Sequence, residues 1–181
     1  MQHAPIYKRK LWRLWLWPFK LLALGEEQIP PGLWLINTFC QRVLGINDEI
    51  PWMVHFSSRV VGNIKIGRNV WKSFAISGGC YIQGINGIII EEDTILGPGV
   101  KIISANHDLN NFGKSEKSEP IIIGKKCWIG ANSVILPGVA LGEGCVVGAG
   151  SIVTKSFPEY SKIAGNPARE IKRYFKEKYN K

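Results

Sequence analysis

The sequence predicts an all-β fold, a parallel β-helix, because the chain repeats itself every six residues between Ile123 and Pro158. The first position of each block holds a branched apolar residue, and the second is mostly glycine. Neither a helical period of 3.6 residues nor simple strand alternation gives this pattern. A hexapeptide period is typical of short strands that stack into triangular coils. The first-position residues are Ile123, Ile129, Ile135, Leu141, Val147 and Val153.

Three such blocks make one coil, and successive coils stack at the ordinary spacing between strands, about 4.8 Å. The first-position side chains then point into the prism and pack on their equivalents in the coils above and below. The fifth position is small or apolar throughout. Cys127 and Cys145 occupy it one full coil apart, so we expect their side chains to stack inside the prism.

The same period runs more weakly through the preceding residues. Lys72, Gly78 and Gly84 interrupt it, which predicts irregular first coils. The apolar residues that keep the six-residue phase there are Val70, Ile76, Ile82, Ile88 and Val100, with Ile66, Ile90, Leu96 and Ile102 at the first position.

A polar loop is predicted at residues 104–120. Ile102 and Ile123 are 21 residues apart, which is one coil of 18 plus three, so the extra chain must be extruded from the prism. Long loops on rigid scaffolds often carry function.

Composition fits one folded core, since 45% of the 181 residues are hydrophobic. The net charge of +9 is concentrated at the two ends of the chain. Residues 1–25 contribute +5 with no acid, residues 162–181 contribute another +5, and the middle is close to neutral. A nucleic-acid partner is not predicted, because such proteins carry a basic stripe along the domain.

The cysteines show neither paired nor metal-ligand spacing, so no metal site is predicted. Buried thiols that act as small apolar side chains are the favoured interpretation, and they indicate a reducing, cytoplasmic location. The four are Cys40, Cys80, Cys127 and Cys145.

The first fifty residues lack the repeat. Residues 8–24 form a hydrophobic and basic segment that is too short and too often interrupted by charge and proline to span a bilayer. Two interpretations stay open for it: an interfacial anchor that gives peripheral association with the inner face of the membrane, or an arm that packs on its own prism or on a neighbouring subunit. After Pro31, apolar residues at helical spacing predict a short helix that stops at Gly45.

The end of the chain, residues 166–181, is predicted to form a helix that folds back on the last coil. Asn166 and Pro167 have the chemistry of an N-cap and a first helical residue. Ile171, Tyr174 and Phe175 would form its apolar face.

From Pro51 to Arg173 the chain resembles the hexapeptide-repeat acyltransferases, in particular the branch of maltose, galactoside, xenobiotic and polysaccharide O-acetyltransferases. The resemblance implies a left-handed β-helix acyltransferase domain at residues 51–165, between the arm with its short helix (residues 1–50) and the C-terminal helix. It is carried by S-A-N-H-D at 104–108, C-W-I-G-A-N-S-V-I-L-P-G-V at 127–139, V-G-A-G-S-I-V-T-K-S-F-P at 147–158 and I-A-G-N-P-A-R-E-I at 163–171.

This resemblance implies that His107, at the start of the loop, is the general base that deprotonates an acceptor hydroxyl as it attacks a thioester. Asp108 or a backbone carbonyl would hold the imidazole in the required tautomer. The implied acyl donor is acetyl-CoA, lying in a groove between subunits of a homotrimer. The residues matched to its binding site are Trp128, Gly130, Ala131, Ala149, Thr154, Lys155 and Arg169.

For the acceptor, Trp71, Phe74, Tyr81 and Asn86 are the candidates, although core packing explains the aromatic residues about as well. The sequence around Pro51 resembles enzymes that modify surface polysaccharide or its lipid-linked precursors. A xenobiotic acceptor such as an antibiotic stays open. So does a non-catalytic assembly scaffold, which would not need His107.

Overall fold

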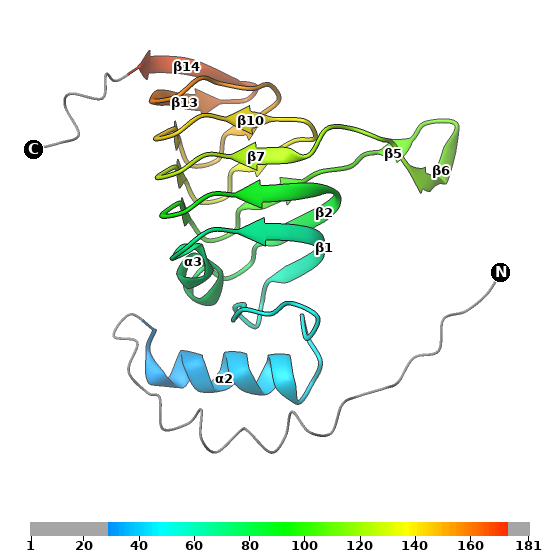
Figure 1. Ribbon diagram of the computed structural model, residues 1–181, viewed down its shortest axis with the longest axis vertical. Helices are drawn as coiled ribbons and strands as arrows, with labels where there is room; N and C mark the ends of the chain where they lie inside the picture. The colour runs from blue at the N-terminus through cyan, green and yellow to red at the C-terminus, as the bar shows by residue number, and fades with distance from the viewer. Residues whose placement is uncertain (1–28, 174–181) are drawn as a thin grey trace, which may run out of the picture.

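The structure, a computed structural model, describes residues 29–173 and is a left-handed parallel β-helix (Figure 1). A stack of triangular coils forms the body. Helix α2 (Pro31–Arg42) lies across the N-terminal end of the stack, and strands β13 (Ser161–Gly165) and β14 (Ala168–Arg173) lie at the other end. The predicted basic arm, residues 8–24, lies outside the described residues. None of the helices within residues 29–173 is long and apolar enough to cross a bilayer.

The prism has three faces, and its first two long strands turn a corner so that each contributes to two of them. β2 pairs with β4 through residues 81–83 and with β7 through residues 88–90. The strands of the first face are β1 (Arg59–Ile66), β2 (Tyr81–Ile90), β4 (Lys101–Ile103), β9 (Val134–Ile135) and β12 (Ile152–Val153).

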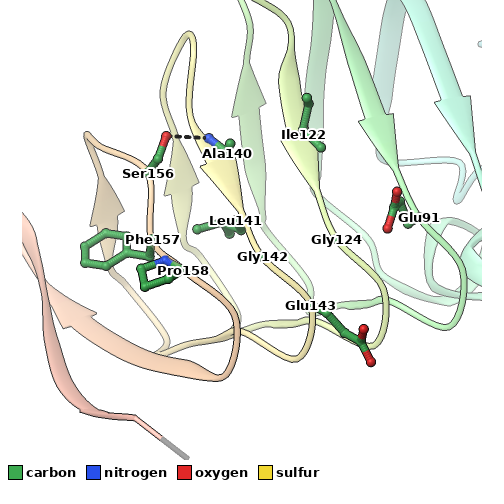
Figure 2. A pocket seen from close by; sticks show the side chains of 10 residues that line it. All are labelled: Glu91, Ile122, Gly124, Ala140, Leu141, Gly142, Glu143, Ser156, Phe157 and Pro158. Atoms are coloured by element: carbon green, nitrogen blue, oxygen red, sulfur yellow. Dashed lines mark hydrogen bonds between the residues drawn. The ribbon is translucent and has the colours of Figure 1, made fainter.

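The second face continues from the ends of β1 and β2 into β7 (Ile121–Ile123) and β10 (Ala140–Leu141). On β10 the amide of Ala140 donates a hydrogen bond to Ser156 Oγ of the next coil over 2.9 Å, and Phe157 of that coil bridges Leu141 (Figure 2). The strands of the third face are β3 (Ile95–Leu96), β8 (Trp128–Ile129), β11 (Val146–Val147), β13 and β14.

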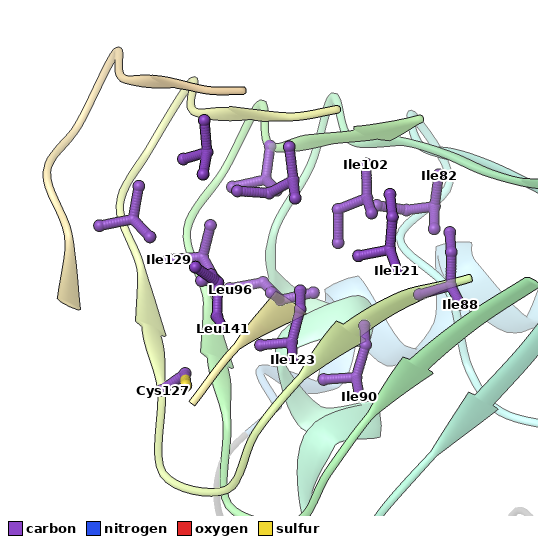
Figure 3. Packing of buried hydrophobic residues seen from close by; sticks show 14 of the residues in the cluster. Ile82, Ile88, Ile90, Leu96, Ile102, Ile121, Ile123, Cys127, Ile129 and Leu141 are labelled. Atoms are coloured by element: carbon purple, nitrogen blue, oxygen red, sulfur yellow. The ribbon is translucent and has the colours of Figure 1, made fainter. Parts of the chain in front are cut away.

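The core confirms the six-residue period. All six first-position residues between Ile123 and Val153 are at most 2% exposed. Figure 3 shows three of them, Ile123, Ile129 and Leu141, among the buried apolar side chains inside the prism. Each face has its own column, and the column of the first face consists of Val60, Ile82, Ile102, Ile135 and Val153. Cys127 and Cys145 are buried as predicted.

The predicted irregularity of the first coils is confirmed and takes the form of a helix. α3 (Val70–Ile76) lies where the third face would have a strand below β3. The hydroxyl of Ser73 accepts a hydrogen bond from the Leu96 amide over 3.1 Å, which satisfies the lower edge of β3. Because this segment is helical, the six-residue phase fails there, and Ile76 is exposed rather than buried.

The helix predicted from residue 166 is wrong for residues 168–173. These form β14, which pairs antiparallel with β13 after the chain reverses near Gly165. Of the three residues whose spacing suggested a helix, only Ile171 lies in this segment, and one residue cannot distinguish a helix from a strand. The open edge of β13 decides between them, since its backbone groups need hydrogen-bond partners. Tyr174 and Phe175 lie outside the described residues.

Candidate active site at the extruded hairpin

The predicted loop at residues 104–120 is confirmed and contains a β-hairpin. It leaves the prism at the corner between the first and second faces, after β4 and before β7 (Figure 1). Its strands are β5 (His107–Asp108) and β6 (Asn111–Ser115), which pair antiparallel. His107 therefore lies on the part of the hairpin that is close to the prism.

The imidazole of His107 has a defined tautomer. Its Nδ1 lies 2.8 Å from the carbonyl oxygen of Phe112. A carbonyl oxygen only accepts hydrogen bonds, so Nδ1 carries the proton and Nε2 of the neutral ring keeps its lone pair. The ring is exposed. His107 is thus arranged to take a proton through Nε2.

Asp108 does not orient His107. Its Oδ1 accepts a hydrogen bond from the Asn110 amide over 2.8 Å, a local contact that shapes the tip of the hairpin. Of the two alternatives that the sequence left open for fixing the tautomer, the structure has the backbone carbonyl. The register of β5 and β6 shifts between His107 and Asp108, so the two residues have partners four positions apart on β6.

Asn86 holds both ends of the extruded segment. Its Nδ2 lies within hydrogen-bonding distance of the Ser104 carbonyl at 2.9 Å, the Glu116 carbonyl at 2.8 Å and Ser118 Oγ at 2.9 Å. Ser118 Oγ also donates to the Ser104 carbonyl over 2.9 Å. The predicted acceptor residue Asn86 thus anchors the hairpin that carries His107.

Gln83 is a second anchor, and the sequence did not single it out. The Ala105 amide donates to its Oε1 over 3.0 Å, and its Nε2 donates to the Ala105 carbonyl over 3.4 Å. Gln83 and Asn86 lie on β2, directly beneath the corner where the chain leaves the prism. A polar side chain within an otherwise apolar strand, one coil before a long loop, is the signal that would have found it.

The residues matched to the donor site fall at a different corner. Gly130, Ala131 and Ala149 lie between the third and first faces, where successive coils stack closely. A Cβ added to Gly130 would lie 2.6 Å from the Ala149 amide nitrogen, so only glycine permits this approach. Ala131 is half-buried and Ala149 is exposed. Backbone and small side chains therefore line this corner.

The other predicted donor residues are distributed around the prism. Trp128 is on the third face, with more than half of its surface exposed. Thr154 and Lys155 follow β12 at the same corner as the hairpin, and Lys155 Nζ lies 5.6 Å from the ring centre of Phe157. Arg169, on β14, is exposed at the C-terminal end. One chain does not bring these residues and His107 into a single cluster.

The predicted acceptor residues divide between core and surface. Phe74 is wrong as a ligand contact, because it is only 2% exposed and packs against Trp52, with 5.9 Å between ring centres. Trp71 is half-buried on α3. Tyr81 is 40% exposed at the start of β2, on the first face.

His55 is separate from the hairpin, in the turn before β1, where it stacks on Phe56. Burial lowers the pKa of its imidazole, and Ser57 Oγ lies 2.9 Å from its Nδ1. Across residues 29–173, no group of three or more His, Cys, Asp or Glu side chains is placed to hold a metal ion.

A groove of about 600 Å³ lies on the outer surface of the second face, away from His107 (Figure 2). Its lining includes Ile122, Ala140 and Ser156, with Glu91 and Glu143 at the adjoining corner, and no residue of the hairpin. A smaller hollow of about 450 Å³ lies against the hairpin tip. We favour the hairpin as the reactive centre, because the larger groove contains no histidine and its two carboxylates lie at the adjoining corner.

Comparison with known proteins agrees with this fold. Residues 120–155 match the family model described as the hexapeptide repeat of succinyl-transferase. The chain is 36% identical over 133 residues to the galactoside O-acetyltransferase of Escherichia coli, covering 71% of this chain and 62% of that protein. It is 35% identical over 129 residues, 70% of this chain and 63% of the relative, to a Staphylococcus aureus protein whose acetyltransferase name is provisional. The chain thus spans less than two thirds of the length of these relatives.

Two solved structures are similar. A hexapeptide-repeat acetyltransferase from Vibrio cholerae, solved with acetyl-CoA, has a TM-score of 0.56 and 27% identity, covering 64% of this chain and 63% of that chain. A maltose O-acetyltransferase from Clostridium difficile, at 24% identity and a TM-score of 0.52, covers 81% of this chain and 90% of that chain and supports the fold. In its repeat, its prism and its sequence, the chain is thus similar to the hexapeptide-repeat acetyltransferases.

Proposed function

We propose that this protein is an O-acetyltransferase that moves an acetyl group from acetyl-CoA to a hydroxyl of a sugar or of a surface polysaccharide precursor. The observation that carries the proposal is the tautomer of His107, whose Nδ1 is bonded to the Phe112 carbonyl so that Nε2 is left to accept a proton. The acetyl-CoA complex of the Vibrio cholerae relative supports the donor. The galactoside O-acetyltransferase of Escherichia coli supports a sugar hydroxyl as the acceptor.

In the proposed reaction, Nε2 of His107 removes the hydroxyl proton while the acceptor oxygen forms a bond to the thioester carbonyl carbon. The tetrahedral adduct then collapses, and its carbon–sulfur bond breaks. The imidazolium returns the proton to the departing thiolate, so the products are an acetyl ester and free CoA. The Phe112 carbonyl bonded to Nδ1 stabilises the imidazolium between these steps. No covalent enzyme intermediate is needed.

The donor is proposed to lie along the corner formed by Gly130, Ala131 and Ala149. Small residues there leave room for a pantetheine arm and expose backbone amides to it. The Ala131 amide is our candidate donor to the developing oxyanion. Lys155 and Arg169 are exposed cations suited to the phosphates of CoA.

We propose a homotrimer, because His107 and the donor corner lie at different edges of one prism. A neighbouring copy would supply the second edge. The third face also carries an apolar row that a neighbour would cover, with Ile95 and Trp128 exposed and Val146 half-buried. A reducing, cytoplasmic location fits the four cysteines, all of which are buried and unpaired.

A thiol-release assay with acetyl-CoA tests the activity across a panel of sugars, lipid-linked glycans and hydroxylated antibiotics. We expect acceptor-dependent release of CoA, and a loss of about 10²- to 10⁴-fold in kcat for His107→Ala. Lys114→Ala, an exposed change on the same hairpin, is the matched control. Equal rates for His107→Ala and the wild type would refute the role of His107, and absence of release with every acceptor would favour the scaffold.

Complementation tests the shared site. His107→Ala removes the base, and Ala149→Trp blocks the donor corner, so each homo-oligomer should be inactive. If each active site combines the hairpin of one subunit with the donor corner of another, then a mixed oligomer contains some sites in which both are wild type. Refolding the two variants together should therefore restore part of the activity. Mixed oligomers that form and stay inactive would contradict a site between subunits.

A further inference from the structure

The first face of the prism borders both parts of the proposed active site. Its strands begin at the donor corner of Gly130, Ala131 and Ala149 and end at the corner where the hairpin with His107 leaves the prism. An acceptor that reaches both His107 and a thioester in the donor corner therefore lies beside a first face, whichever copies supply the two corners. The outward side chains of this face are the ones that such an acceptor would meet.

Three outward side chains form a row across the first three strands of this face. Arg59, Tyr81 and Lys101 are register partners on β1, β2 and β4. The residue that follows each of them in its strand is at most 3% exposed and belongs to the core. Because successive side chains of a strand point to opposite sides, the row itself points outward. Tyr81 is 40% exposed, Arg59 is exposed, and Lys101 is half-buried.

The two cations of this row have no acidic partner. Neither Arg59 nor Lys101 belongs to an ion pair within residues 29–173. Lys101 Nζ donates to the Gly99 carbonyl over 3.0 Å, a neutral partner that leaves the charge of the ammonium uncompensated. The other strand residues of the first face carry no charge. They are residues 60–61, 82–83, 102–103, 134–135 and 152–153.

The acidic residues that flank this face lie at its borders rather than in the row. Asp48 and Glu49 precede β1, and the hairpin segment 104–120 has three acids and two lysines. The turns of the donor corner contain no acid, at residues 97–100, 130–133 and 148–151. The two cations are each one strand away from Tyr81, at a spacing of about 4.8 Å. The charge beside the Tyr81 ring is therefore positive.

We propose that the acceptor is an acidic sugar, whose carboxylate or phosphate binds Arg59 and Lys101 while a sugar ring stacks on Tyr81. This inference rests on the proposed acetyl transfer and names the class of acceptor for it. The guanidinium of Arg59 can bind a carboxylate or a phosphate through two parallel N–H bonds, and the ammonium of Lys101 adds a second positive charge. A pyranose ring over Tyr81 has one cation on each side, so the anionic group would also orient the sugar relative to His107.

Kinetics with three matched acceptors test the proposal: cellobiose, cellobiouronic acid and cellobiose 6-phosphate. In the thiol-release assay, kcat/KM should be at least about tenfold higher for an acidic acceptor than for cellobiose, the effect expected from one hydrogen bond to a charged group. The two acidic acceptors distinguish a carboxylate from a phosphate. Arg59→Gln combined with Lys101→Met should reduce the preference to a ratio of about one, with the KM for acetyl-CoA unchanged.

Single variants serve as controls. Arg59→Gln alone, a change at an exposed position, should already lower the ratio, and Arg59→Lys, which keeps the charge, should restore part of it. Lys65→Met is the matched control, because Lys65 is exposed on the same strand but past the corner, on the second face. It should leave the ratio unchanged.

Equal kcat/KM for the neutral and acidic acceptors in the wild type would overturn the proposal, as would a preference that persists in the double variant. A raised KM for acetyl-CoA in the double variant, with the acceptor ratio unchanged, would assign the cations to the donor instead. Saturation-transfer NMR with cellobiouronic acid and cellobiose 6-phosphate, recorded without acetyl-CoA, separates this inference from the proposed activity. If no acceptor is acetylated, the proposed function fails. Binding that is lost in the double variant then still supports a site for acidic sugars, and wild-type protein that binds neither compound refutes it.

Discussion

Replacing Asn86 by alanine tests how the prism positions His107. The change removes the Nδ2 group that lies between the two ends of the extruded segment, within 2.9 Å of the Ser104 and Glu116 carbonyls and of Ser118 Oγ. Two N–H bonds serve these three acceptors. Each hydrogen bond contributes about 0.5 to 1.5 kcal/mol, so the loss of both should weaken the attachment of the hairpin by about 1 to 3 kcal/mol. The Asn86 amide still donates to Ser104 Oγ, so the prism itself should stay intact.

Hydrogen exchange measures this weakening directly. The Glu116 amide donates to the Asn106 carbonyl over 2.8 Å at the base of the hairpin. Its protection should fall by a factor of about 5 to 160, which is what about 1 to 3 kcal/mol of easier opening produces. In the thiol-release assay, kcat should fall about tenfold or more as His107 loses its position, with the KM for acetyl-CoA nearly unchanged.

Two variants serve as controls. Asn86→Asp keeps the shape but replaces the donor with a carboxylate facing carbonyl oxygens, so it should be at least as damaging as alanine. Asn111→Ala alters a bond within the hairpin tip, where its Oδ1 accepts from the Gly113 amide, and should leave exchange at Glu116 near the wild-type level. Unchanged exchange and unchanged kcat in Asn86→Ala would refute the reasoning. Unchanged exchange with a raised KM for the acceptor would instead make Asn86 a direct acceptor contact.

Two further predictions concern the core. Ile123→Ala should lower the free energy of unfolding by about 2 to 5 kcal/mol, because the Ile123 side chain is fully buried. The control is Ile122→Ala, whose side chain is 39% exposed and whose loss should lower that free energy far less. Equal urea midpoints for the two variants would contradict the inward-facing column. Burial raises the pKa of the Cys80 thiol above its ordinary 9.0. The thiol then ionises at a lower pH in the unfolded protein than in the folded one, so the free energy of unfolding should decline as the pH rises above 9.0. Urea unfolding between pH 8 and about 10.5 should show a shallower decline for Cys80→Ala than for the wild type. If the free energies of unfolding of the two proteins fall in parallel with pH, the role of the Cys80 thiol is refuted.

The repeat made the coils predictable because the period alone decides which side chains face inward. Ile129 and Val147 stack on each other whatever surrounds them, since they occupy the same rung position one coil apart. The site of the extruded loop followed from the same count. Residues 168–173 were not predictable in this way. Their strand depends on the open edge of β13, which exists only once the coils have formed.

The orientation of α2 was missed for a related reason. Its apolar spacing predicts a helix but does not say which side faces the protein; Cys40 is buried, and so are the polar residues Asn37 and Gln41. They are needed because the turns at residues 47–56 leave backbone groups that lack partners of their own. The sequence left a backbone carbonyl open as the partner of His107 but not which one, because Phe112 meets the imidazole only once the hairpin has folded.

The antiparallel direction of β14 also limits how these molecules can associate. A solenoid ends in a rung whose backbone groups could accept another copy, and repeated addition of this kind builds fibres. On the third face, β14 runs against the direction of every strand below it, so an incoming chain meets a rung that cannot extend the parallel register. Growth along the column axis is thereby discouraged, while the sides of the prism stay available for closed assembly.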